Sequence, residues 1–325
     1  MGDKVSKIKK GIGKNLVKAI EFDESDDIDA QGITDIIQVL TSSNNTSVTR
    51  LHVTGPDILS DEVAKNAAIF FKSYHTDTIR VRVQQSLSLG FRRAKFESNG
   101  INRIFSSLMY CDIIGELIIT LDSYNPFDQS NLDTLRTTLL ASETGSGEPN
   151  KCKLNRLTIG GFAITPAIAK GFAELMSKQT HITQLSLTKW EMNSENIRVL
   201  VSEDRFEYLD LTGCEVGDDA CKVIASAFER QHNGLSKLKK LILNENSISE
   251  KGVSHLIAGI QNSENGVINE IQLNNNNMTG DEEELVTLKN LLKERGGETS
   301  TEPTPDLKSI LGNAVKGSVI ENTNE

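Results

Sequence analysis

The chain has 325 residues, of which 37% are hydrophobic and 25% charged, so it is long enough to bury a sizeable core and is not disordered as a whole. Its formal net charge of −10 argues against general nucleic-acid binding, because such binding depends on lysine and arginine residues that neutralise phosphates. No apolar run approaches the ~20 residues that a membrane-spanning helix requires.

Residues 1–16 form a basic segment, which we interpret as a polar cap or arm before the first structural repeat. Its lysines stand at positions 4, 7, 9, 10 and 14. Gly2 and Ser6 also fit the loose N-myristoylation pattern, and one acyl group with a polybasic segment suffices for membrane attachment. Membrane association through residues 1–18 is therefore an alternative to the cap.

A pattern of apolar residues recurs between residues 17 and 295. It is clearest in LKKLILNENSI, where Leu238, Leu241, Leu243, Asn246 and Ile248 stand at offsets 0, 3, 5, 8 and 10. Copies of the pattern start at residues 17, 48, 78, 114, 154, 182, 206, 238 and 268. The spacing predicts about nine divergent repeats that each begin with a short strand.

Helix signals follow the strand patterns. Thr165 and Pro166 supply a cap and a first-turn proline, and Thr279 with Glu282 forms a capping box. Each repeat is therefore predicted to run strand, turn, helix. Because a single unit cannot bury its apolar face alone, we expect neighbouring units to stack into a solenoid.

The segments LKKLILNENSI, INEIQLNNNNM and FEYLDLTGCEV resemble the leucine-rich-repeat family, and within it the ribonuclease-inhibitor-like class with a full helix in each repeat. The resemblance implies an α/β solenoid with a curved parallel sheet on the concave side and helices on the convex side. Asn246 and Asn276 at the ninth position are expected to bond backbone groups of the adjacent turn, and Cys214 to fill the same slot with its thiol. Trp190 and Phe162 depart from this rule, which predicts a break in the ladder there.

Side chains between the buried strand positions are expected on the concave face, because successive side chains of a strand alternate. Arg50, His52, Arg80 and Arg82 should form a basic patch on adjacent strands. The remaining candidates for contact with a partner are Arg156, Tyr208, Asp210, Lys240 and Glu270. Trp190 is interpreted mainly as a core residue and is a secondary candidate. A face divided by charge suits the steering of a protein partner, and Arg, Tyr and Trp are enriched in binding hot spots.

The C-terminal residues change in character. GGETSTEPTP predicts a linker over 296–305, and residues 306–325 predict a short amphipathic helix followed by a polar tail.

The chain lacks the motifs of catalytic sites. It contains no HExxH, GxSxG or phosphate-binding GxxxxGK[ST] sequence, and Cys214 falls on the structural ladder. The four cysteines match no zinc spacing and no secretory leader precedes them, which predicts free thiols in a reducing, cytoplasmic compartment. We therefore expect no cofactor and no metal.

The sequence favours a monomeric, non-enzymatic module that binds a protein on its concave face. The alternatives are a small-GTPase regulator of the activating type, by analogy with other proteins of this repeat class, and a membrane-tethered adaptor. The divergent repeats and Asn-rich turns also suit a bacterial effector that is delivered into a host cell, in which case the host cytoplasm is the working compartment.

Overall fold

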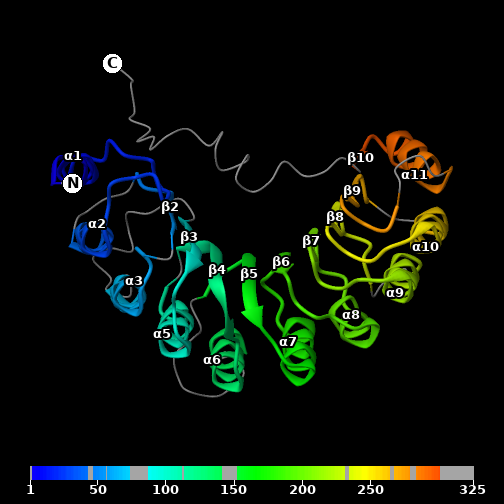
Figure 1. Ribbon diagram of the computed structural model, residues 1–325, viewed down its shortest axis with the longest axis horizontal. Helices are drawn as coiled ribbons and strands as arrows, with labels where there is room; N and C mark the ends of the chain where they lie inside the picture. The colour runs from blue at the N-terminus through cyan, green and yellow to red at the C-terminus, as the bar shows by residue number, and fades with distance from the viewer. Residues whose placement is uncertain are drawn as a thin grey trace. The chain divides into compact units, whose positions relative to one another are not determined.

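The computed structural model describes residues 2–42, 47–55, 57–73, 87–111, 113–140, 152–230, 234–263, 267–278 and 283–300. Strands and helices alternate along the chain, and within each compact unit the helices cover one face of a parallel sheet (Figure 1). Two units are distinguished, with a boundary between Arg156 and Leu157. We call them the N-terminal and C-terminal units and describe each by itself.

Among its described residues, the N-terminal unit has four parallel strands in the order in which they occur in the sequence. Its elements are α1 (Gly2–Gly13), β1 (Ala19–Phe22), α2 (Ala30–Ser42), β2 (Arg50–Thr54), α3 (Asp61–Ser73), β3 (Leu87–Ala94), α5 (Ser98–Leu108), β4 (Ile114–Pro126) and α6 (Gln129–Leu140). The register places His52 of β2 between Glu21 of β1 and Gly90 of β3, and Gly90 beside Ile118 of β4.

The C-terminal unit continues the same alternation. Its elements are β5 (Arg156–Ala163), which begins at the boundary, α7 (Pro166–Lys178), β6 (Gln184–Thr188), α8 (Ser194–Leu200), β7 (Tyr208–Asp210), α9 (Asp218–Phe228), β8 (Lys240–Ile242), α10 (Glu250–Gln261), β9 (Glu270–Gln272), α11 (Glu283–Glu294) and β10 (Glu298–Ser300). The register puts Tyr208, Lys240 and Glu270 in one row.

The repeat pattern predicted from sequence corresponds to the core. Leu238, Leu241, Leu243 and Ile248 are each fully buried, as are the equivalent residues of the preceding repeat and the strand residues Ile268, Ile271 and Leu273 of the next one. The apolar faces of the helices pack against these strand residues and complete the core. Thr165 caps α7, because its side chain accepts a hydrogen bond from the Ile168 amide at 3.3 Å. Each unit is an α/β structure of the leucine-rich-repeat solenoid type.

In the repeats that start at residues 206, 238 and 268, the ninth position joins adjacent turns. The Asn246 side chain donates to the Leu211 carbonyl at 2.8 Å and accepts from the Val216 amide at 2.9 Å. Asn276 repeats the first contact on the Leu243 carbonyl at 2.8 Å. The Cys214 thiol reaches the Leu187 carbonyl at 3.3 Å, so the predicted substitution of cysteine for asparagine in the ladder is confirmed.

The residue before the ladder position takes a left-handed backbone conformation in many repeats. Gly161 and Gly213 adopt it with φ of 74° and 65°, where glycine carries no steric penalty. Arg93, Lys189, Glu245 and Asn275 adopt it with φ between 54° and 60°. A sharp corner with positive φ is therefore a recurring part of the repeat.

Helix α1 packs against the first repeat. Val5, Ile8 and Ile12 on its apolar face are buried, Lys9 pairs with Asp35 of α2 at 3.0 Å, and Lys4 pairs with Asp26. The residues that an amphipathic membrane anchor would offer to lipid are thus covered by protein.

The structure adds strands in two places where the sequence pattern predicts none. The described strand next to β2 is Leu87–Ala94, in which Leu87, Leu89 and Phe91 supply the buried alternation. The strand predicted from Thr78 lies outside the described residues. Glu298–Ser300, expected within a linker, instead pairs in parallel with β9. The exposed edge of β9 offers backbone partners even to a polar segment, which sequence pattern alone does not reveal.

Several further predictions concern residues outside the described ranges. These are the capping box of Thr279 and Glu282, residues 301–305 of the expected linker, and the amphipathic helix and tail of 306–325.

Candidate protein-interaction surface

The sheet face opposite the helices carries a cluster of charged and polar residues in the N-terminal unit. We call this side of either sheet the open sheet face. The cluster contains Glu21, Arg50, His52, Ser88, Arg92, Glu116 and Arg156, and is called the Arg/His cluster below. Strand alternation places these residues there, because Leu51, Leu89 and Leu117 between them point into the core.

His52 lies at the centre of the cluster. Its Nε2 atom is 2.7 Å from the Ser88 hydroxyl, and its Nδ1 atom is 3.2 Å from Nη1 of Arg92. The Ser88 hydroxyl in turn donates to the Glu116 carboxylate. A short series of hydrogen bonds therefore runs from Arg92 through His52 and Ser88 to Glu116.

The direction of this series fixes the protonation of His52. A guanidinium can only donate, so Nδ1 must accept from Arg92 and Nε2 must carry the proton of the neutral ring. Nε2 then donates to the Ser88 oxygen, whose own proton points to Glu116. Burial and the positive charges of Arg92, Arg50 and Arg156 lower the pKa of His52 to about 3, which keeps the ring neutral at physiological pH.

The Ser88–His52 pair is not arranged for nucleophilic catalysis. A serine nucleophile gives its proton to an unprotonated histidine nitrogen, and a carboxylate orients the other side of the ring. Here the histidine donates to the serine, and an arginine stands where that carboxylate would be. The serine hydroxyl is a relay to Glu116 rather than an activated nucleophile.

Gly90 makes room for the imidazole. A Cβ atom at this position would lie 2.8 Å from Cδ2 of His52 and 3.3 Å from Nη1 of Arg92. Only glycine therefore lets the His52 ring lie over the neighbouring strand while it keeps its bond to Arg92.

The open sheet face of the C-terminal unit has a different chemistry. Asp210 accepts from the hydroxyls of Ser186 at 2.8 Å and Thr212 at 2.6 Å. Lys240 pairs with Glu270 at 2.5 Å, and the Asn244 amide donates to Gln272 at 3.2 Å. Burial raises the pKa of Asp210 in spite of the hydrogen bonds from Thr212 and Ser186. The polar groups of this face are largely bonded to one another.

The candidates chosen from sequence divide between the two units. Arg50, His52 and Arg156 come together in the Arg/His cluster, whereas Tyr208, Asp210, Lys240 and Glu270 lie on strands β7–β9. Arg80 and Arg82 lie outside the described residues, and β1 and β3 occupy the positions beside β2.

Trp190 is not an exposed anchor, because it is fully buried and its ring packs against Phe172 with centroids 4.8 Å apart. Its secondary candidacy for partner binding is therefore wrong, and its interpretation as a core residue is confirmed.

Sequence reasoning missed Ser88 and Arg92 because it placed the third strand too early. The signal that finds them is the strict alternation in LSLGFRRA, where Leu87, Leu89 and Phe91 are buried and the residues between them face outward. Glu116 stood in the correct strand and was not singled out.

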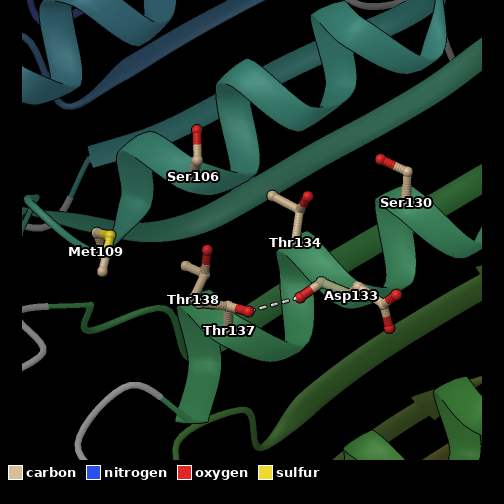
Figure 2. A pocket seen from close by; sticks show the side chains of 7 residues that line it. All are labelled: Ser106, Met109, Ser130, Asp133, Thr134, Thr137 and Thr138. Carbon is tan, nitrogen blue, oxygen red and sulfur yellow. Dashed lines mark hydrogen bonds between the residues drawn. The ribbon is translucent and has the colours of Figure 1, made fainter. Parts of the chain in front are cut away.

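A depression of about 550 Å³ lies between α5 and α6 of the N-terminal unit (Figure 2). It is lined by Ser106, Met109, Ser130, Asp133, Thr134, Thr137 and Thr138. Several of its hydroxyls already donate to helix carbonyls, such as Thr137 to Asp133 at 2.9 Å and Thr138 to Phe105 at 3.0 Å. Asp133 is paired with Arg136 at 3.0 Å. We assign it no catalytic chemistry.

The described part of the chain also lacks the features of a metal site or a membrane span. There, no three His, Cys, Asp or Glu residues gather to hold a metal ion, and no helix is long and apolar enough to cross a membrane. Cys111, Cys152, Cys214 and Cys221 are buried free thiols, and burial raises the pKa of Cys214 and Cys221 to about 12. Neither of these two thiols is an activated nucleophile.

Comparison with known proteins gave a distant relative with the same kind of repeat. No protein-family model matches the chain. Over 116 residues, or 34% of the chain, it is 25% identical to a human protein described as NACHT, LRR and PYD domains-containing protein 13. The match spans only 11% of that relative's length. The similarity agrees with the leucine-rich-repeat fold and is confined to a part of each protein.

Proposed function

We propose that the protein is a non-catalytic module that binds a protein partner on its open sheet face. The observation that carries the proposal is the Arg/His cluster, a polar surface on a scaffold of buried leucines that no helix of the described residues covers. Rigid strands present its residues at fixed spacing, which lowers the entropic cost of binding. The partial similarity to a protein whose name includes leucine-rich repeats supports an interaction role.

The direction of hydrogen bonding supports the non-catalytic part of the proposal. His52 is neutral and donates to Ser88, and the Cys214 and Cys221 thiols are held protonated by burial. A nucleophile with an adjacent base is the usual requirement for covalent catalysis.

Other predictions from the sequence go beyond this proposal. The ribonuclease-inhibitor-like class, cytoplasmic location, monomeric state, GTPase regulation and delivery into a host cell stay predictions. A tether through residues 1–18 is disfavoured as an amphipathic anchor, because Val5, Ile8 and Ile12 pack inside the protein.

The proposal is tested by site-specific photo-crosslinking in a cytosolic lysate. A benzophenone amino acid is placed at Thr120 or Thr188 on the open sheet faces, and at Lys65 or Lys170 on the helices of the same two units. We expect a discrete protein adduct from at least one sheet position and none from the helix positions. Adducts of equal yield from the helix positions would refute the proposed surface.

A charge-reversal pair supplies the matched control. Arg50→Glu is expected to abolish the adduct formed from a sheet position, because it inverts the charge of the cluster, whereas Lys65→Glu should leave it unchanged.

A further inference from the structure

Arg92 differs from the other arginines of the Arg/His cluster. Arg50 pairs with Glu21 at 2.9 Å, and Arg156 pairs with Glu116 at 3.1 Å. Arg92 has no carboxylate within salt-bridge distance among the described residues, and its one hydrogen bond there goes to the neutral His52. The next residue, Arg93, pairs with Asp122 at 2.8 Å and also with Glu24.

The unpaired state of Arg92 is costly. The residue is half-buried, and burial lowers the pKa of its guanidinium, the positive charges of Arg156 and Arg50 adding to the effect while Glu116 and Glu21 oppose it. A charged group removed from water without an ionic partner loses hydration that a neutral imidazole only partly replaces. A ligand that supplies a negative charge would recover that loss.

The surroundings hold the guanidinium in place for such a ligand. The bond to His52 uses one of its five N–H groups and restrains its plane, and the absence of a Cβ atom at Gly90 leaves room for the His52 ring that makes this bond. The remaining N–H groups match the two oxygens of a carboxylate, which arginine binds in a bidentate manner.

The charge balance selects the class of ligand. Three guanidinium groups and two carboxylates leave the cluster with one formal positive charge, and the pairing of Arg50 and Arg156 places it on Arg92. A singly charged carboxylate neutralises this excess. A phosphate with nearly two negative charges would bring a surplus close to Glu116 and Glu21.

We propose that Arg92 anchors a carboxylate of the protein partner, supplied by an Asp or Glu residue or by the partner's C-terminus. This inference rests on the proposed function of the open sheet face and names the chemistry that the face recognises. His52 and Gly90 act as positioning residues, because they orient the Arg92 guanidinium and do not contact the ligand charge.

The test uses random twelve-residue peptides displayed on phage in two formats, one with a free C-terminus and one with the C-terminus fused to the coat protein. Binders selected on the full-length protein are synthesised and their dissociation constants measured by fluorescence polarisation. We expect selected peptides to share one acidic position. The fused format succeeds if that group belongs to an Asp or Glu residue, and only the free format succeeds if it is a C-terminus.

A double-mutant cycle isolates the contact. Arg92→Gln should weaken binding at least about 10-fold, and amidation of the acidic group should weaken binding to the native protein by a similar factor. The two changes together should cost little more than either alone. Arg92→Lys, which keeps the charge and loses the planar fork, should fall between, and Arg198→Gln on α8 is the control. Circular dichroism verifies that each variant is folded.

The outcomes separate the two proposals. Peptides that crosslink to the open sheet face but bind Arg92→Gln at full strength, or that contain no carboxylate, would overturn this inference and leave the proposed function standing. Failure of every selected peptide to contact the open sheet face would contradict both.

Discussion

The open sheet faces of the two units use polar residues in opposite ways. In the N-terminal unit, a histidine and arginines converge, and Arg92 keeps a charge that no described carboxylate neutralises. In the C-terminal unit, hydroxyl, amide and carboxylate groups bond mainly to one another across β6–β9. The N-terminal face therefore keeps a charged group that can bind a ligand, whereas the polar groups of the C-terminal face are mostly bonded to one another.

The turns beside these faces differ as well. Asn246 and Asn276 link the C-terminal turns through their amide groups, whereas the N-terminal unit has buried Ala94 in the ladder position after β3 and packs Phe91 against Phe96 with centroids 5.5 Å apart. The repeats with cysteine or asparagine at the ladder position therefore hold their turns by hydrogen bonds, and the third N-terminal repeat holds its turn by apolar contact.

The largest expected effect tests the role of the ladder. Asn246→Ala removes the bonds to the Leu211 carbonyl and the Val216 amide, both in a buried turn, and should lower the free energy of unfolding by about 3 kcal/mol. Urea unfolding followed by circular dichroism measures it. Asn262→Ala, which removes an exposed bond to Glu229 at the end of α10, should cost less than about 0.5 kcal/mol. Equal costs for the two variants would break the comparison.

The next effect concerns the packing of the Arg/His cluster. Gly90→Ala places a Cβ atom 2.8 Å from the His52 ring, so we expect the ring to shift and the free energy of unfolding to fall by about 2 kcal/mol. Gly13→Ala at the end of α1 meets no atom within 4 Å and is the matched control. A crystal structure of Gly90→Ala in which His52 and Arg92 remain bonded would show that the glycine is not needed for positioning.

A smaller effect follows from the protonation of His52. The unfolded imidazole binds a proton near pH 6.5 and the folded one near 3, so stability should be lost as the pH falls from 6.5 toward 3. Between pH 6.5 and 5.5 this amounts to about 1 kcal/mol. Urea titrations at several pH values should show a shallower acid slope in His52→Gln than in the native protein, and identical slopes would contradict the neutral, buried state of His52.

The smallest effect has the opposite sign and lies in the C-terminal unit. Burial raises the pKa of Asp210 above 3.8, so the folded state is penalised when the carboxylate is ionised. As the pH falls through the folded pKa that penalty is relieved, and the native protein should gain stability relative to Asp210→Asn. The same titrations measure it. A gain for the variant instead would mean that the hydrogen bonds from Ser186 and Thr212 outweigh burial.

The sequence predicted the fold well where ladder residues accompany the leucine pattern. Leu238, Leu241 and Leu243 with Asn246 identify a repeat without ambiguity. The third repeat has Ala94 in place of asparagine, so the spacing pattern places this repeat at Thr78 instead. The pattern therefore does not identify Arg92 as a residue of the sheet face. Strand alternation predicts which side chains face outward. The unpaired state of Arg92 depends on contacts among three strands, and the sequence spacing does not predict those contacts.

The left-handed corners that are occupied by residues other than glycine make the protein less stable than it could be. Lys189 and Glu245 adopt positive φ at the surface, a conformation that costs about 1 kcal/mol or more for a residue other than glycine. Glycine already occupies the same corner at Gly161 and Gly213. Replacing these corner residues with glycine, one at a time, is therefore expected to raise the melting temperature without altering the core or the proposed partner-binding face.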